Sequence, residues 1–110
     1  MAKTWRLTLQ AEASLVEIAN WTAQVFGPNQ AKAYELDLIA LCQDLAEGRA
    51  HTRSCRDHLS EGVSPDLRFA RFGSHLVIFV ELGSEVVITD FLHARRDLPK
   101  LLAEQYLDDW

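Results

Sequence analysis

The fold of this chain is decided by residues 67–93, LRFARFGSHLVIFVELGSEVVITDFLH. The segment contains one alternating run and two almost continuously apolar runs, at residues 67–72, 75–82 and 85–93. Glycine-serine pairs at 73–74 and 83–84 separate the runs, and a two-residue break that begins with glycine is typical of a tight β-hairpin. The segment therefore predicts a three-stranded antiparallel meander whose apolar strands are covered on at least one face.

A strand and two helices are expected before this meander. Residues 4–9, TWRLTL, alternate as a half-buried strand does. Apolar residues then recur at helical spacing over 11–26 and again over 29–47. Between the two, Gly27 can take the left-handed conformation that ends a helix, and Pro28 cannot extend one. The two helices would form an antiparallel hairpin.

The remaining segments complete an α+β fold with the element order β-α-α-β-β-β-α. Residues 49–66 are polar and without periodicity, which indicates a loop or irregular segment. Residues 98–110 are helix-like. We expect the helical hairpin on one face of an antiparallel sheet and a more open opposite face, covered at most in part by the short C-terminal helix. Trp5, Trp21 and Phe79 are assigned to the core.

Length and composition indicate one soluble domain, residues 1–110. No apolar run approaches the roughly 20 residues of a membrane span, and the first residues do not have the apolar core of a secretory signal. The two cysteines, Cys42 and Cys55, are too few for a disulfide framework. We therefore expect a cytoplasmic protein with reduced thiols and no membrane association.

The formal net charge of −5 is unevenly distributed along the chain. Residues 1–48 carry three basic and six acidic side chains, and residues 72–110 carry three basic and seven acidic ones. The middle segment, 49–71, has five basic and three acidic side chains. A negatively charged protein repels phosphate at long range, so direct sequence-specific nucleic-acid binding is not expected. Only the middle segment, with the arginines near residue 95, could offer a local cationic patch.

Three segments together resemble the RelE/ParE superfamily of bacterial toxins. WRLTLQAEASLVEIANW has the family's passage from strand to helix, and FGPNQAKAYELDLIALCQDLAE is similar to its second helix. LRFARFGSHLVIFVELGSEVVITDFLHARRDL is similar to the ParE pattern of a basic strand, a turn, an apolar strand and a closing LHxRxDL. The order and spacing of these motifs agree over nearly the whole chain and favour the ParE branch.

The resemblance implies a toxin of a type II toxin–antitoxin system, held in a hetero-oligomer by a ParD-like antitoxin encoded beside it. ParE-like members poison DNA gyrase by trapping its cleaved-DNA complex, whereas RelE-like members cut mRNA in the ribosome. We expect a gyrase inhibitor without an active site of its own and without a cofactor. The alternative is a ribosome-dependent mRNA endoribonuclease. The antitoxin would lay a helix and an extended segment over the hairpin and the sheet.

The alternative activity would depend on His93, Arg95 and Arg71. RNA cleavage needs a base, an acid and cations that stabilise the developing negative charge; a histidine and arginines can supply these. RNA-cutting relatives often have a tyrosine near the chain end, in some directly after the matching histidine, where this chain has Ala94. That departure counts against ribonuclease chemistry. A structural interpretation also stays open, in which His93 closes a strand and Asp97 caps the next helix.

Partner contact is the role we expect for a set of arginines and leucines on the strands and the C-terminal segment. They are Arg68, Arg71, Arg95, Arg96, Leu98, Leu101 and Leu102. For Arg68 and Arg71 the alternative is protection of an edge strand against pairing, and for the leucines it is helix packing on the sheet. His51, Cys55 and His58 are close in sequence, but a lone short cluster lacks the usual four-ligand spacing, so we predict no metal site.

Overall fold

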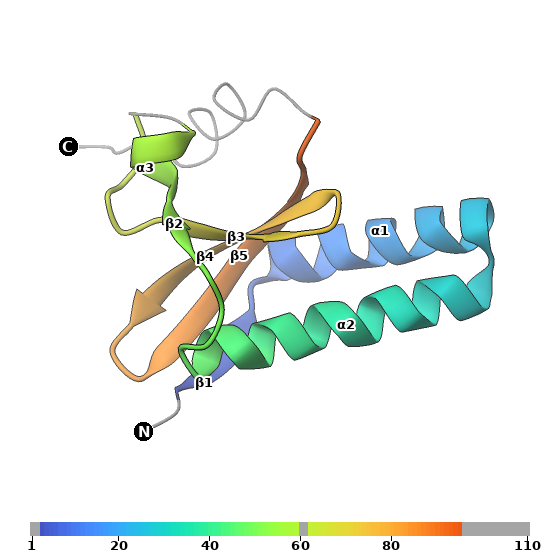
Figure 1. Ribbon diagram of the computed structural model, residues 1–110, viewed down its shortest axis with the longest axis horizontal. Helices are drawn as coiled ribbons and strands as arrows, with labels where there is room; N and C mark the ends of the chain where they lie inside the picture. The colour runs from blue at the N-terminus through green and yellow to red at the C-terminus, as the bar shows by residue number, and fades with distance from the viewer. Residues whose placement is uncertain (1–2, 60–61, 96–110) are drawn as a thin grey trace.

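The computed structural model describes residues 3–59 and 62–95. Its elements are β1 (Thr4–Leu7), α1 (Leu9–Phe26), α2 (Pro28–Ala46), β2 (Arg53–Ser54), α3 (Cys55–His58), β3 (Arg68–Phe72), β4 (His75–Leu82) and β5 (Glu85–His93). A helical hairpin, α1 and α2, packs against a five-stranded sheet (Figure 1). The predicted α+β class, helical hairpin and antiparallel meander are confirmed. The predicted C-terminal helix, 98–110, lies outside the described residues.

The strand order in the sheet is β1-β5-β4-β3-β2. Tight turns join β3 to β4 and β4 to β5, and their glycines, Gly73 and Gly83, have φ of 55° and 62°, a region that favours glycine. Strand β1 runs parallel to β5, with Thr4 opposite Glu85. The sheet is therefore mixed, whereas the sequence analysis expected a wholly antiparallel one. A parallel neighbour needs a long crossover, and the hairpin of α1 and α2 belongs to that crossover.

Thr8 ends β1 and starts α1. Its Oγ1 accepts a hydrogen bond from the backbone N–H of Ala11 at 3.1 Å, the usual arrangement of an N-cap, and donates to the carbonyl oxygen of Thr89 at 3.0 Å. The strand therefore stops at Leu7 and the helix begins at Leu9, two residues earlier than the apolar periodicity predicted. The cap also ties the start of α1 to β5.

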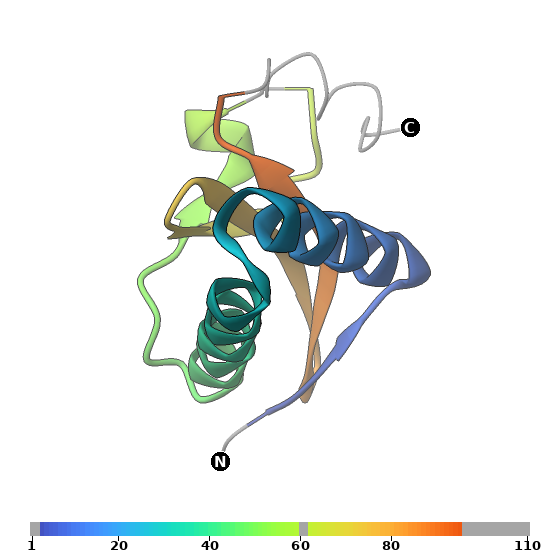
Figure 2. The same ribbon diagram turned by 90° about the vertical axis from the view of Figure 1, so that its right-hand side faces the viewer.

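The two helices form a long arm. Gly27, with φ of 94°, and Pro28, at the first position of α2, make the tight turn between them, as predicted. The 18 residues of α1 span about 27 Å at 1.5 Å per residue. The turn end of the arm projects past the sheet in Figure 1 and faces the viewer in Figure 2. Within residues 3–59 and 62–95, no helix combines the length and apolar character that a membrane span requires.

The main core lies between the arm and the sheet. Its buried members are Ala11, Leu38, Cys42, Leu45, Ala70, Val77, Phe79, Val86, Ile88 and Phe91. Trp5 of β1 packs against this cluster from the margin, and Phe79 lies inside it, as the sequence analysis assigned them. Burial of this apolar surface, worth about 25 cal/mol per Å², is what holds the arm on the sheet.

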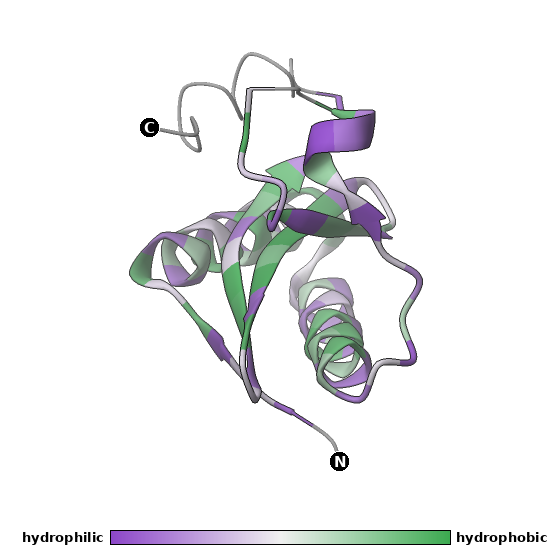
Figure 3. Ribbon diagram, turned by 90° about the vertical axis from the view of Figure 1, so that its left-hand side faces the viewer, coloured by the Kyte–Doolittle hydropathy of each residue, from purple (hydrophilic) through white to green (hydrophobic). Residues whose placement is uncertain are grey.

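The opposite face of the sheet carries a second apolar cluster, which we call the outer cluster, and is covered in part. Its buried members are Cys55, Val63, Leu67, Leu76, Ile78 and Leu92. The segment expected to be a loop, 49–66, contains β2 and α3, and these elements with Val63 cover part of this face. Elements of two and four residues are too short to produce a periodic signal. In Figure 3, α3 is coloured as hydrophilic and the central strands of the sheet as largely hydrophobic.

Candidate functional site

The arm carries large apolar side chains that are in contact with solvent. They are Leu9, Val16, Trp21, Val25, Phe26, Leu36 and Ile39, which we call the arm surface. Trp21 and Phe26 are 55% and 62% exposed, and their rings pack edge to face with centroids 5.9 Å apart. The assignment of Trp21 to the core was therefore wrong. Helix α1 is apolar over more of its circumference than the sheet can cover. Exposed apolar surface of this kind marks interaction sites.

A hollow of about 450 Å³ lies between α1 and the end of β5, and we call it the α1 hollow. Ser14 and Trp21 line it from the helix, and Asp90 and His93 line it from the strand. Asp90 is 1% exposed, and its Oδ1 accepts hydrogen bonds from the Ser14 hydroxyl at 2.5 Å and from the backbone N–H of Phe91 at 2.8 Å. The buried carboxyl group is thus satisfied and fixes α1 to β5.

Tyr34, His75 and His93 form a row of rings at one end of the sheet. The Tyr34 hydroxyl on α2 lies 2.6 Å from Nδ1 of His75 and 3.3 Å from the carbonyl oxygen of Phe72. The His75 and His93 rings are edge to face, 5.2 Å apart. Burial lowers the pKa of His75, the neighbouring His93 lowers it further, and burial raises the pKa of Tyr34. Sequence periodicity offered no signal for this tie between arm and sheet, because its partners are 41 residues apart.

A second hollow, of about 370 Å³, lies on the face of the sheet that the arm does not cover, and we call it the outer hollow. It is lined by His51, Arg53, Leu59, Phe69, Arg71, Leu76 and Ala94. Among these, Arg71 on β3 donates from Nε to the carbonyl oxygen of Gly73 at 3.1 Å. The outer hollow therefore combines an apolar floor with basic side chains.

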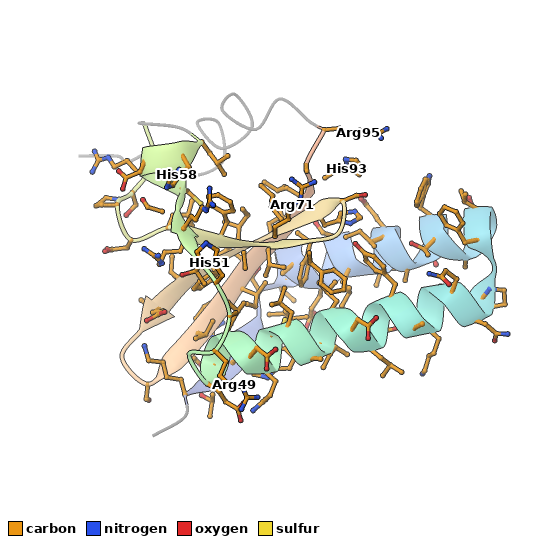
Figure 4. The ribbon with its side chains drawn as sticks, viewed as in Figure 1. Arg49, His51, His58, Arg71, His93 and Arg95 are labelled. Atoms are coloured by element: carbon orange, nitrogen blue, oxygen red, sulfur yellow. The ribbon has the colours of Figure 1, made fainter. Side chains whose placement is uncertain are left out.

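The three residues considered for RNA cleavage do not share one hollow. Arg71 lies opposite Leu76, whose side chain is in the outer cluster, whereas His93 lies opposite His75, which contacts α2. Because neighbouring residues on a strand alternate between faces, Arg71 and His93 project to opposite faces of the sheet. Figure 4 shows both near the same end of the strands. Arg95 is exposed and donates its backbone N–H to Nδ1 of His93 at 3.1 Å.

Of the residues expected to contact a partner, Arg71 and Arg95 are placed above, and Arg68 is partly buried. Arg68 donates from Nε and Nη2 to the hydroxyl of Thr52, at 3.2 Å and 3.0 Å. Strand β3 is flanked by β2 only at Arg68 and Phe69, so Arg71 lies beyond the end of that pairing. The other predicted contact residues lie outside the described residues: Arg96, Leu98, Leu101 and Leu102.

The histidines and the cysteine of the 51–58 segment each have different neighbours. Cys55 is buried in the outer cluster, His58 packs edge to face on Phe69, and His51 accepts a hydrogen bond from Arg53. In the part of the chain that the structure describes, no group of three His, Cys, Asp or Glu side chains is placed to hold a metal ion.

Comparison with known proteins agrees with this geometry. Residues 5–98 match the family model described as the ParE toxin of the type II toxin–antitoxin system parDE. The chain belongs to the ParE toxin family. A solved structure titled "Chromosomal ParDE TA system from P. aeruginosa" has a similar fold, with a TM-score of 0.65 and 16% identity, over 86% of this chain and 98% of that one. Among curated protein sequences, none matches.

Membership in the ParE family gives the arm surface a context. The family model covers α1, α2 and the strands except Thr4, the first residue of β1, so the exposed apolar side chains of the arm belong to the shared domain and not to an added segment. ParE toxins belong to the type II toxin–antitoxin system parDE, so the family implies a cognate antitoxin as partner.

Proposed function

We propose that this ParE-family chain inhibits DNA gyrase by protein–protein contact and is neutralised by a cognate, ParD-like antitoxin in a cytoplasmic hetero-oligomer. The observation that carries the proposal is the arm surface, where Trp21 and Phe26 are more than half exposed. Aromatic side chains of this kind are the usual anchors of protein interfaces.

The antitoxin is proposed to lie along the arm. An amphipathic helix can place its apolar face on side chains that recur along α1, and the α1 hollow beside Trp21 can receive a side chain of an extended segment. Covering these side chains removes apolar surface from water, which supplies the affinity.

A protein target is favoured over free RNA by charge. The chain carries a net charge of −5, and phosphate binding gains its affinity from many cationic contacts. Of the residues considered for RNA cleavage, His93 and Arg71 project to opposite faces of the sheet. Neither feature supports an RNA-cleaving site, so we favour gyrase inhibition over the ribonuclease alternative.

The target is tested with purified gyrase and relaxed plasmid. The chain should block supercoiling and cause cleaved DNA to accumulate, and the protein encoded by the adjacent reading frame should restore supercoiling. Unchanged supercoiling, together with mRNA cleavage on translating ribosomes that His93→Ala abolishes, would refute gyrase inhibition and establish the ribonuclease alternative.

The antitoxin surface is tested by affinity measurements with that adjacent protein. Trp21→Ala should weaken binding by about 30-fold or more, since truncation of a central aromatic anchor costs at least about 2 kcal/mol. Leu82→Ala is the matched control, because Leu82 is also a large exposed apolar side chain but lies on β4 and not on the arm. Equal weakening by the two substitutions would contradict the proposed surface.

A further inference from the structure

The outer hollow lies on the face of the sheet opposite the arm. Its floor is apolar: Leu76 is buried, and Leu59, Phe69 and Ala94 are half-buried. Its rim carries the exposed side chains of His51, Arg53 and Arg71. The arm surface and the outer hollow therefore lie on different faces of the molecule, and a ligand on one leaves the other accessible.

The two arginines of this rim have no carboxylate partner, in contrast to three other cations of the described residues. Lys3, Arg6 and Arg49 each pair with a carboxylate: Lys3 with Glu81 at 2.7 Å, Arg6 with Glu85 at 3.1 Å, and Arg49 with Asp44 at 3.0 Å. Among the described residues, Arg53 and Arg71 pair with no carboxylate. Arg53 donates instead to the His51 ring at 3.5 Å, and Arg71 donates to the Gly73 carbonyl oxygen.

The rim thus presents two guanidinium groups without acidic partners among the described residues, and both lie beside apolar surface. Each guanidinium has several donors, and the contacts given above use one donor of each. The remaining donors suit carboxylates, which arginine binds through two parallel hydrogen bonds.

We infer that the outer hollow binds an acidic peptide segment of a protein partner, with an apolar side chain on the floor and carboxylates on Arg53 and Arg71. The apolar floor suits a side chain better than a phosphate backbone, and the net charge of −5 opposes a polyanion such as nucleic acid more strongly than a short acidic segment. This surface is additional to the antitoxin surface proposed above, and its ligand can be tested without gyrase.

The test uses the full-length chain and fluorescence anisotropy. The probe is a fluorescein-labelled peptide of roughly twelve residues, with aspartates and glutamates on both sides of a central phenylalanine, a length that matches a short recognition segment. The same peptide with asparagine and glutamine in place of the acids, and an oligo-dT of equal length, are the comparison probes. The acidic peptide should bind more tightly than either.

Matched variants locate the binding. Arg53→Gln and Arg71→Gln should each weaken the acidic peptide by about threefold, and the double variant by about tenfold, as exposed ion pairs at separate sites do. Arg49→Gln removes the same charge at the C-terminal end of α2, away from the outer hollow, and should leave binding unchanged (Figure 4). Circular dichroism confirms that each variant is folded, and amide shifts on peptide addition should include Phe69, Leu76 and Ala94.

Four results would each overturn the inference. The first is equal affinity for the acidic and neutral peptides, and the second is equal weakening by Arg49→Gln. The third is tighter, Arg71-dependent binding of oligo-dT, which would assign the hollow to nucleic acid. The fourth is acidic-peptide binding that appears only when Glu104, Asp108 and Asp109 are neutralised, which would assign it to the chain's own C-terminal segment. Failure to inhibit gyrase would refute the proposed target and leave the peptide result as it stands.

Discussion

The contact between Tyr34 and His75 should carry a measurable part of the stability that holds the arm on the sheet. Tyr34→Phe deletes one oxygen and keeps the ring, whose edge-to-face contact with Phe72 at 4.9 Å remains. The buried His75 then loses the hydroxyl that lies 2.6 Å from its Nδ1. A buried polar group without a partner costs about 1–3 kcal/mol, so we expect the free energy of unfolding to fall by about 2 kcal/mol.

Urea denaturation followed by circular dichroism measures this loss. Thermal melting gives a second reading, because about 2 kcal/mol lowers the melting temperature of a domain of this size by roughly 8 °C or more. In a His75→Leu background the imidazole is absent, so removing the Tyr34 hydroxyl should cost well under about 1 kcal/mol. A loss below about 0.5 kcal/mol in the wild-type background, or equal losses in both backgrounds, would refute the reasoning.

Three further outcomes follow from burial. The pKa of His75 is lower in the folded chain than the unfolded value of about 6.5, so the unfolded state binds more protons just below that pH. The free energy of unfolding should therefore be fully retained above about pH 6.5 and fall as the pH drops. In urea titrations at several pH values, His75→Leu should show a shallower fall of this free energy with pH. Leu38→Ala should lower the free energy of unfolding by about 2–5 kcal/mol, whereas Leu36→Ala, two positions away on α2 but 56% exposed, should change it by less than about 0.5 kcal/mol. If urea denaturation gave similar losses for the two variants, the assigned faces of the helix would be contradicted. Burial raises the pKa of Cys42 to about 11 and that of Cys55 to about 12. A colourimetric disulfide reagent should therefore label neither thiol rapidly at neutral pH until guanidinium unfolds the chain, and rapid labelling of the native protein would contradict the burial.

The two surfaces differ in how much of each could be predicted from the sequence. Exposure of Trp21 was missed because helical periodicity identifies which residues are apolar, and not how much of a helix the sheet will cover. The arginine set was recognised from charge, but the division that places Arg71 in the outer hollow and His93 in the α1 hollow depends on strand register. The tie from Tyr34 to His75 joins two elements that no local pattern relates.

The sequence by itself determined the elements whose causes are local. Gly73 and Gly83 set the two tight turns, so the bounds of β4 and β5 agree with the apolar runs that predicted them. Gly27 and Pro28 set the turn of the arm in the same way. A turn residue acts through the conformation of its own backbone, which is why sequence alone suffices there.

Only the tertiary structure decided which distant segments became neighbours. It placed β1 parallel to β5, with Thr4 opposite Glu85, and it put β2 and α3 over the outer cluster. It also left the arm surface in contact with solvent and set two arginines around an apolar floor. These features depend on contacts between residues far apart in the chain, and such contacts form only when the buried faces of all the elements are matched together.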